Sequence, residues 1–206
     1  MNFIEDLGVK GYLQIAKVYK DKPEEIIFDD HNIIVSGMSV GLAHFFSGSG
    51  SKSITDYQND RFQVGVSGPP TGGSVSSIYQ LSGPLSSIAE YGAATNFAVV
   101  SGYQIENGVV SPTKDNVFGY IPFKNVTRIN ETSVRYTIIL DEDSANYSSY
   151  TSNRSATDLP LTEIGLFMKN PRGLAVDARI LVAYRAFNQI LKTSDFSLVF
   201  RWTINF

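Results

Sequence analysis

The chain has 206 residues, 43% of them hydrophobic, with no cysteine and a formal net charge of −3. The lack of cysteine excludes disulfides, thiolate metal sites and a cysteine nucleophile, and the weak negative charge argues against a nucleic-acid or anionic-membrane surface. No apolar run reaches the roughly 18 residues of a membrane-spanning helix, and the acidic start of the chain is not typical of a signal peptide. We therefore expect a protein made and folded in a cytosol, with no nucleic-acid partner and no membrane span.

The chain opens with an N-terminal arm, residues 1–10, ahead of the first strand. The arm contains four apolar residues with no obvious place in that strand, which are Phe3, Ile4, Leu7 and Val9. An arm of this content is expected to dock on a protein surface rather than to remain in water. These four residues are therefore candidate interface residues, and packing on the chain's own sheet is the alternative.

The first third of the chain predicts strands around a single helix. Alternating residues indicate strands at 11–19, 26–28, 33–35 and 61–66, with a polar turn at 29–32. Ser36 is the expected N-cap of a helix over about residues 37–46, which Gly48 ends. Because so short a helix is not stable alone in water, it must pack on the sheet.

The rest of the chain predicts more strands, separated by two long surface loops. Further strands are expected at 96–105, 117–123, 125–129, 133–140, 161–168, 174–187 and 196–206. Asn107-Gly108 is typical of the centre of a tight hairpin turn. The segments 67–95 and 141–158 are rich in small and polar residues and are interpreted as the two loops.

The last strand has the clearest pattern in the chain. Every second residue is large and apolar, namely Phe196, Leu198, Phe200, Trp202, Ile204 and Phe206. A period of two places all six on one face, which a second layer must cover. Together with the regular spacing of the other strands, this predicts one mainly β domain over residues 1–206, an antiparallel β-sandwich or jelly roll with one short α-helix.

No constellation typical of catalysis or metal binding is visible. The two histidines, His31 and His44, are interpreted as structural, since the spacing of carboxylate and hydroxyl residues around them predicts neither a metal site nor a catalytic base. The acidic residues 141–143 lack the central glycine and later ligands of a calcium loop, and the glycine-rich stretches 47–51 and 68–73 lack the Lys-Ser/Thr of a phosphate loop. We therefore predict no enzyme, no cofactor and no metal.

Three groups of segments together resemble a known family. They are HNIIV at 31–35 with the following helix and RFQVGVSG at 61–68, then LTEIGLF at 161–167, and finally LVAYRAF at 181–187 with ILKT at 190–193 and RWTINF at 201–206. This combination resembles small structural proteins of tailed bacteriophages, such as tail-fibre, collar and baseplate components. Within it, Glu163 is expected to flank the turn into its strand, Gly165 to permit close approach of a neighbouring backbone, and Lys192-Thr193 to fix the turn before the last strand.

The resemblance implies a non-enzymatic structural component of a virion, made in the bacterial host cytoplasm and located in the tail, baseplate or fibre-attachment region. It would act by docking to other virion proteins and to copies of itself. One alternative is a receptor- or carbohydrate-binding module of the tail, in which Tyr147 and Tyr150 contact a host surface glycan. Another is a head decoration or neck protein.

Overall fold

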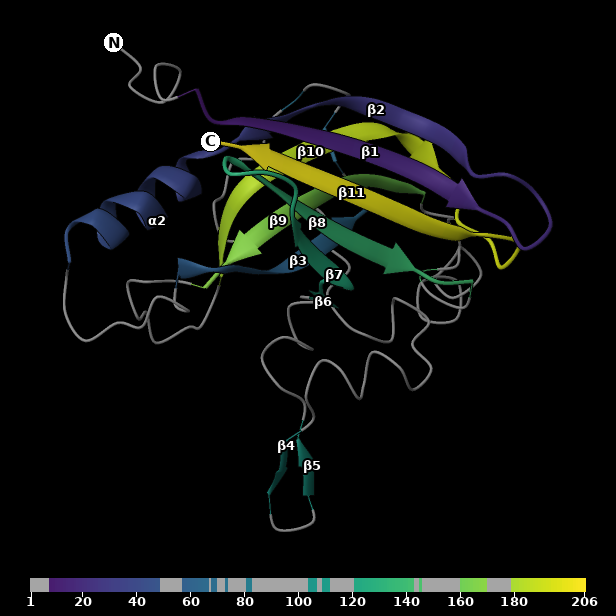
Figure 1. Cartoon of the computed structure of the whole chain (residues 1–206). Helices are drawn as coiled ribbons and strands as arrows, with labels where there is room; N and C mark the ends of the chain where they lie inside the picture. Colours follow the sequence, from purple (N-terminus) through teal and green to yellow (C-terminus); the bar gives the residue numbers. More distant parts are fainter. Residues whose placement is uncertain are drawn as a thin grey trace.

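The structure is a computed structural model that describes part of the chain, and the strands predicted at 96–105, 117–123 and 174–187 lie partly outside the described residues. The described residues are 8–48, 57–66, 68–69, 73, 81–82, 104–106, 109–111, 121–142, 145, 160–169 and 179–206. Their elements are β1 (Lys10–Val18), β2 (Glu25–Ile34), α2 (Ser36–Phe46), β3 (Asn59–Gly65), β4 (Gln104–Glu106), β5 (Val109–Ser111), β6 (Ile121–Pro122), β7 (Asn125–Arg128), β8 (Ser133–Leu140), β9 (Leu161–Met168), β10 (Ile180–Ile190) and β11 (Ser197–Asn205). The prediction of a mainly β, antiparallel fold with one short helix is confirmed for this part of the chain (Figure 1).

In the described part of the chain, nine strands form one antiparallel sheet in the order β6-β3-β9-β10-β2-β1-β11-β8-β7. β2 joins its two halves, because most of β2 pairs with β1 while Ile33 and Ile34 pair with β10. The sheet therefore curls, and the half containing β1, β11 and β8 lies over the half containing β3, β9 and β10 (Figure 1). The layers of the expected sandwich are the two halves of one continuous sheet.

A separate hairpin carries the predicted tight turn. β4 and β5 pair antiparallel, with Glu106 opposite Val109. This register leaves two residues between the strands, as the Asn-Gly pair predicts.

The core lies between the two halves of the sheet, and Trp202 is near its centre. Trp202 is fully buried, opposite Leu13 of β1 and Tyr136 of β8. The predicted apolar face of β11 is confirmed from Leu198 to Ile204. Phe206 is the exception at 52% exposed, because it follows the last residue of the strand and lies at the end of the sheet.

The predicted turn at 29–32 is wrong, because β2 is one unbroken strand of ten residues. Its polar side chains have partners on neighbouring strands of the sheet. Arg185 forms an ion pair with Asp30, and the ring of His31 meets that of Tyr12 edge-on at 5.6 Å. A run of polar residues is therefore compatible here with a strand that faces water.

The helix begins one residue earlier than expected, and Ser36 is not its cap. The N-cap is Val35, which makes no side-chain cap hydrogen bond and instead donates its backbone N–H to the carbonyl of Val182, at 3.1 Å. A Cβ on Gly37 would lie 1.9 Å from the carbonyl oxygen of Leu181, so glycine allows the first turn to approach β10 closely. The helix is thus fixed on the sheet by its first turn. Among the described residues, no helix is long and apolar enough to span a membrane.

Candidate functional site

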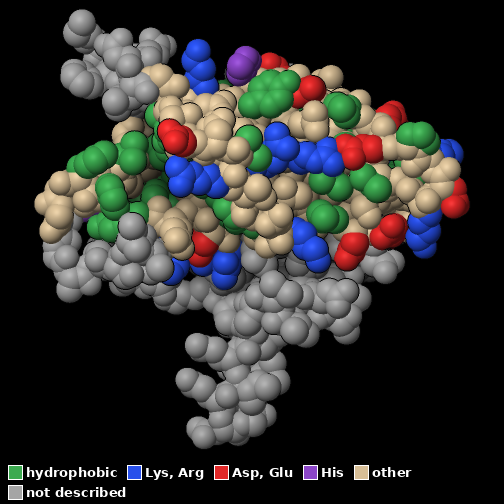
Figure 2. Space-filling model, in the orientation of Figure 1, with side chains coloured by type: hydrophobic (Ala, Val, Ile, Leu, Met, Phe, Trp, Pro, Cys, Tyr) green, Lys and Arg blue, Asp and Glu red, His purple; other side chains and the backbone are tan. Residues whose placement is uncertain are grey.

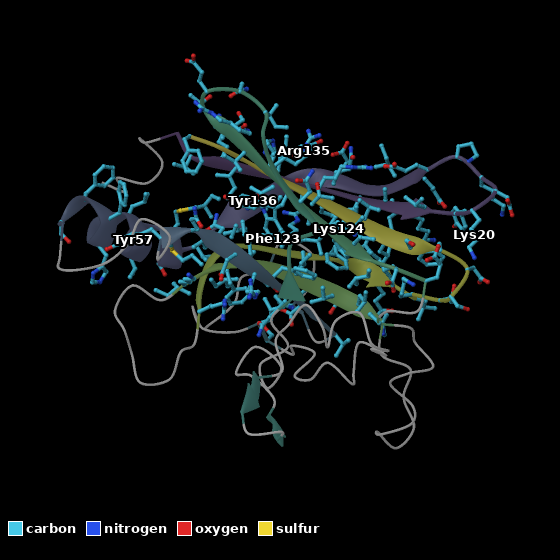
Figure 3. The ribbon with its side chains drawn as sticks, turned by 60° about the horizontal axis from the view of Figure 1, so that its bottom comes forward. Lys20, Tyr57, Phe123, Lys124, Arg135 and Tyr136 are labelled. Carbon is cyan, nitrogen blue, oxygen red and sulfur yellow. The ribbon has the colours of Figure 1, made fainter. Side chains whose placement is uncertain are left out.

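An apolar groove of about 540 Å³ lies beside the helix, and we call it the helix groove. Its walls come from five parts of the chain that are distant in sequence. They include Met38, Leu42 and Phe45 of α2, Val126 of β7, Tyr136 of β8, and Phe206. Figure 3 shows Tyr57, another lining residue, beside the helix, and Tyr136 on the strand across from it. The groove thus forms only when the curled sheet brings these elements together.

Three polar side chains that line the helix groove, those of Tyr57, Asn59 and Tyr136, form hydrogen bonds within the fold. Asn59 donates its side-chain N–H to the Tyr136 hydroxyl at 3.0 Å, and the Tyr57 hydroxyl donates to the backbone carbonyl of His44 at 3.4 Å. Burial raises the pKa of Tyr136, and the hydrogen bond from Asn59 lowers it by a smaller amount. No lining side chain of the groove carries a formal charge near neutral pH among those described. The groove therefore offers an apolar surface to a ligand.

The rim of the helix groove exposes large apolar side chains to water. Phe45 is 43% exposed, Phe46 79%, Val126 50% and Phe206 52%. The Phe45 ring stands nearly perpendicular to those of Phe46 and Tyr57, with centroids 5.5 and 5.4 Å apart. Figure 2 shows hydrophobic side chains gathered at the end of the molecule where the helix lies. Contiguous exposure of this kind is typical of a surface that contacts another protein segment.

Met38, Leu42, Phe45 and Phe46 share one side of the helix at helical spacing, but the sheet covers only part of that side. Met38 is buried, but both phenylalanines are exposed at the end of the helix. Neighbouring residues of a helix point about 100° apart, so Phe45 and Phe46 point in different directions at the end of the helix. That adjacency is a sequence signal of apolar surface that the sheet does not cover.

A second group of buried polar side chains lies on the outer face of β3, β9 and β10. The Tyr184 hydroxyl donates to Glu163 Oε2 at 2.9 Å, and the backbone N–H of Ser82 donates to the same oxygen at 3.3 Å. The N–H of Leu81 donates to the side-chain oxygen of Gln63 at 3.4 Å. We call these five residues the outer-face anchor, because they hold the short segment 81–82 against the sheet.

The outer-face anchor corrects the expected role of Glu163. This residue lies inside β9 and is fully buried, whereas it was predicted to flank a turn. At Gly165, a Cβ would lie 2.5 Å from Leu181 Cδ1 and 2.8 Å from Leu81 Cδ2, so the close neighbours are side chains instead of the predicted backbone. Burial, followed by the nearby charge of Glu163, raises the pKa of Tyr184 well above its usual value of 10.0. These contacts position a segment of the chain on the sheet.

Lys192 fixes the turn before β11, as predicted. Its side chain is only 1% exposed, and its ammonium donates to the backbone carbonyls of Thr193 at 2.8 Å and Glu142 at 3.4 Å. The same ammonium lies 5.3 Å from the centre of the Phe196 ring. The lysine thus provides a hydrogen-bond donor for one carbonyl of the turn and for one carbonyl of the neighbouring segment.

The other residues singled out from the sequence are partly outside the described chain. Phe3, Ile4, Leu7, Tyr147 and Tyr150 all lie outside it. Val9 is half-buried and packs against the core. Among the residues that the structure describes, no group of three or more histidine, aspartate or glutamate side chains could hold a metal ion.

Comparison with known proteins gives no relative on which to base a function. No family model matches the chain, and neither a curated protein nor a solved structure matches it. The helix groove and the sequence pattern are therefore the basis for the function proposed below.

Proposed function

We propose that this chain is a non-enzymatic structural component of a tailed-phage virion, in its tail, baseplate or fibre-attachment region. It acts by docking to other virion proteins through the helix groove. The observation that carries the docking role is the exposed apolar rim of that groove. The phage setting is supported by the resemblance of the segments at 31–35, 161–167 and 201–206 to virion proteins.

The helix groove has the properties of a docking surface. Its floor presents paired polar atoms, so an apolar segment can bind without leaving them unsatisfied. Burying an exposed side chain as large as Phe46 contributes about 1.5–3 kcal/mol. Several such side chains lie around one groove, which is enough to give a specific contact once it is repeated over many subunits.

The test is incorporation of the chain into particles. We expect mass spectrometry of purified virions from the phage that encodes the chain to detect the wild-type protein. Replacing Phe46→Ser removes the most exposed apolar side chain of the rim, and this variant should fold normally by circular dichroism but be depleted from particles. Leu191→Ser is the matched control, because Leu191 is 55% exposed but is not one of the residues around the groove, whereas the Phe46 ring packs against that of the lining residue Phe45.

Two outcomes would contradict the proposal in different ways. Absence of the wild-type chain from purified particles would refute the virion role. Normal incorporation of the folded Phe46→Ser variant would refute docking through the helix groove.

A further inference from the structure

The N-terminal arm leaves the fold at the rim of the helix groove. In the pairing of β1 with β11, Lys10 lies opposite Asn205. Val9 is therefore next to the end of β11, where Phe206 lines the groove. Figure 1 shows the start of β1 and the C-terminus side by side, close to the first turn of α2. The arm therefore joins the sheet beside Phe206, which lines the helix groove.

The arm has the composition and the reach to cover this surface. Phe3, Ile4 and Leu7 provide apolar side chains, while Glu5 and Asp6 can remain in water. Residues 1–7 can span up to about 25 Å when extended. The helix beside the groove has eleven residues and is therefore about 16 Å long. The arm can consequently lie along the full length of the groove.

We propose that residues 1–7 occupy the helix groove of their own chain in the free subunit, and that an assembly partner replaces them. This inference rests on the proposed docking role of the groove and adds its occupant before assembly. A tethered segment has an effective concentration in the millimolar range, so even a weak contact is favoured within one chain. Covering Phe45, Val126 and Phe206 also protects a patch that would otherwise promote aggregation before assembly.

The first experiment measures the contact directly. A fluorescein-labelled peptide of residues 1–8 is titrated against the full chain and against a chain lacking residues 1–7, with anisotropy as the readout. We expect the truncated chain to bind the peptide and the full chain to bind at least about tenfold more weakly, because its own arm competes. In the truncated chain, Val126→Asp should abolish binding, while Ile26→Asp, at a site 54% exposed outside the groove, should leave it unchanged.

A second experiment does not depend on the truncated chain folding. Because the chain has no cysteine, the pair Ile4→Cys and Phe45→Cys can be introduced and oxidised without competing thiols. We expect a crosslinked monomer on a non-reducing gel, and no crosslink for Ile4→Cys with Leu191→Cys. A crosslinked dimer would show that the arm belongs to a second copy, and it would overturn the assignment to the same chain.

The two proposals can fail separately. If the folded truncated chain does not bind the peptide, or if both chains bind it equally, the arm is not the occupant. In that case, depletion of the Phe46→Ser variant from particles would still support docking by another segment. If the peptide binds as expected but Phe46→Ser is incorporated normally, the groove holds the arm and the docking role is refuted.

Discussion

Trp202→Ala is the sharpest test of the core, because Trp202 lies in the core between the two halves of the sheet. Its side chain is fully buried, and on the neighbouring strands it lies opposite Leu13 and Tyr136. Its indole N–H has no hydrogen-bond partner among the described residues, so the substitution removes packing and no hydrogen bond. A cavity of this kind costs about 3–5 kcal/mol, a large share of the roughly 5–15 kcal/mol of a typical domain.

The assay is urea unfolding and thermal unfolding, each followed by far-ultraviolet circular dichroism. Fluorescence is unsuitable, because Trp202 is the chain's one tryptophan. We expect the midpoint of thermal unfolding to fall by about 6–20 °C, since 1 kcal/mol corresponds to about 2–4 °C at this chain length. Leu191→Ala, at a site 55% exposed, should change stability by less than about 0.5 kcal/mol. A loss below about 1 kcal/mol for Trp202→Ala would refute the reasoning, because a site that collapses so easily is not packed as described.

Three further predictions concern the sheet and the loops. Because the folded-state pKa of Tyr184 is raised, its stabilising effect is present below about pH 10 and is lost at higher pH. The free energy of unfolding, measured with urea, should therefore fall less for Tyr184→Phe than for wild type between about pH 8 and about pH 11. Gly165→Ala should destabilise the fold by about 1–3 kcal/mol in the same assay, since its Cβ would meet the side chains of Leu181 and Leu81, and a neutral result would mean that these side chains move aside without cost. Limited proteolysis of the free protein, read by mass spectrometry, should cut first within 67–95 or 141–158, and first cuts inside the terminal strands would contradict the predicted domain organisation.

Strands with one clear apolar face were predictable from the sequence. β8 and β9 have the bounds expected from their alternation, and the buried residues of β11 follow its period of two. β2 was not predictable in this way, because Asp30 and His31 resemble turn residues. Their partners, Arg185 and Tyr12, come from other strands, and a local pattern carries no information about such partners.

The helix groove could not be predicted for the same reason. Phe45, Val126, Tyr136 and Phe206 come together only through the curl of the sheet and the pairing of β7 with β8. The sequence does show two adjacent phenylalanines, Phe45 and Phe46, that point about 100° apart at the end of the helix, and it shows that Phe206 ends an apolar series. These clues indicate unpaired apolar surface, but they do not show that the side chains share one groove.

The outer-face anchor gives a physical reason for the Glu-Ile-Gly sequence of β9. Ile164 faces the core, while Glu163 and Gly165 face the opposite side, as strand alternation requires. On that side Glu163 accepts a hydrogen bond from the backbone of Ser82, and the missing side chain of Gly165 leaves room for Leu81. One strand therefore serves the core with one face and fixes the course of a distant segment with the other. A carboxylate and a glycine two residues apart make these two contacts, and this explains why Glu163 lies buried inside the strand and not at the turn before it.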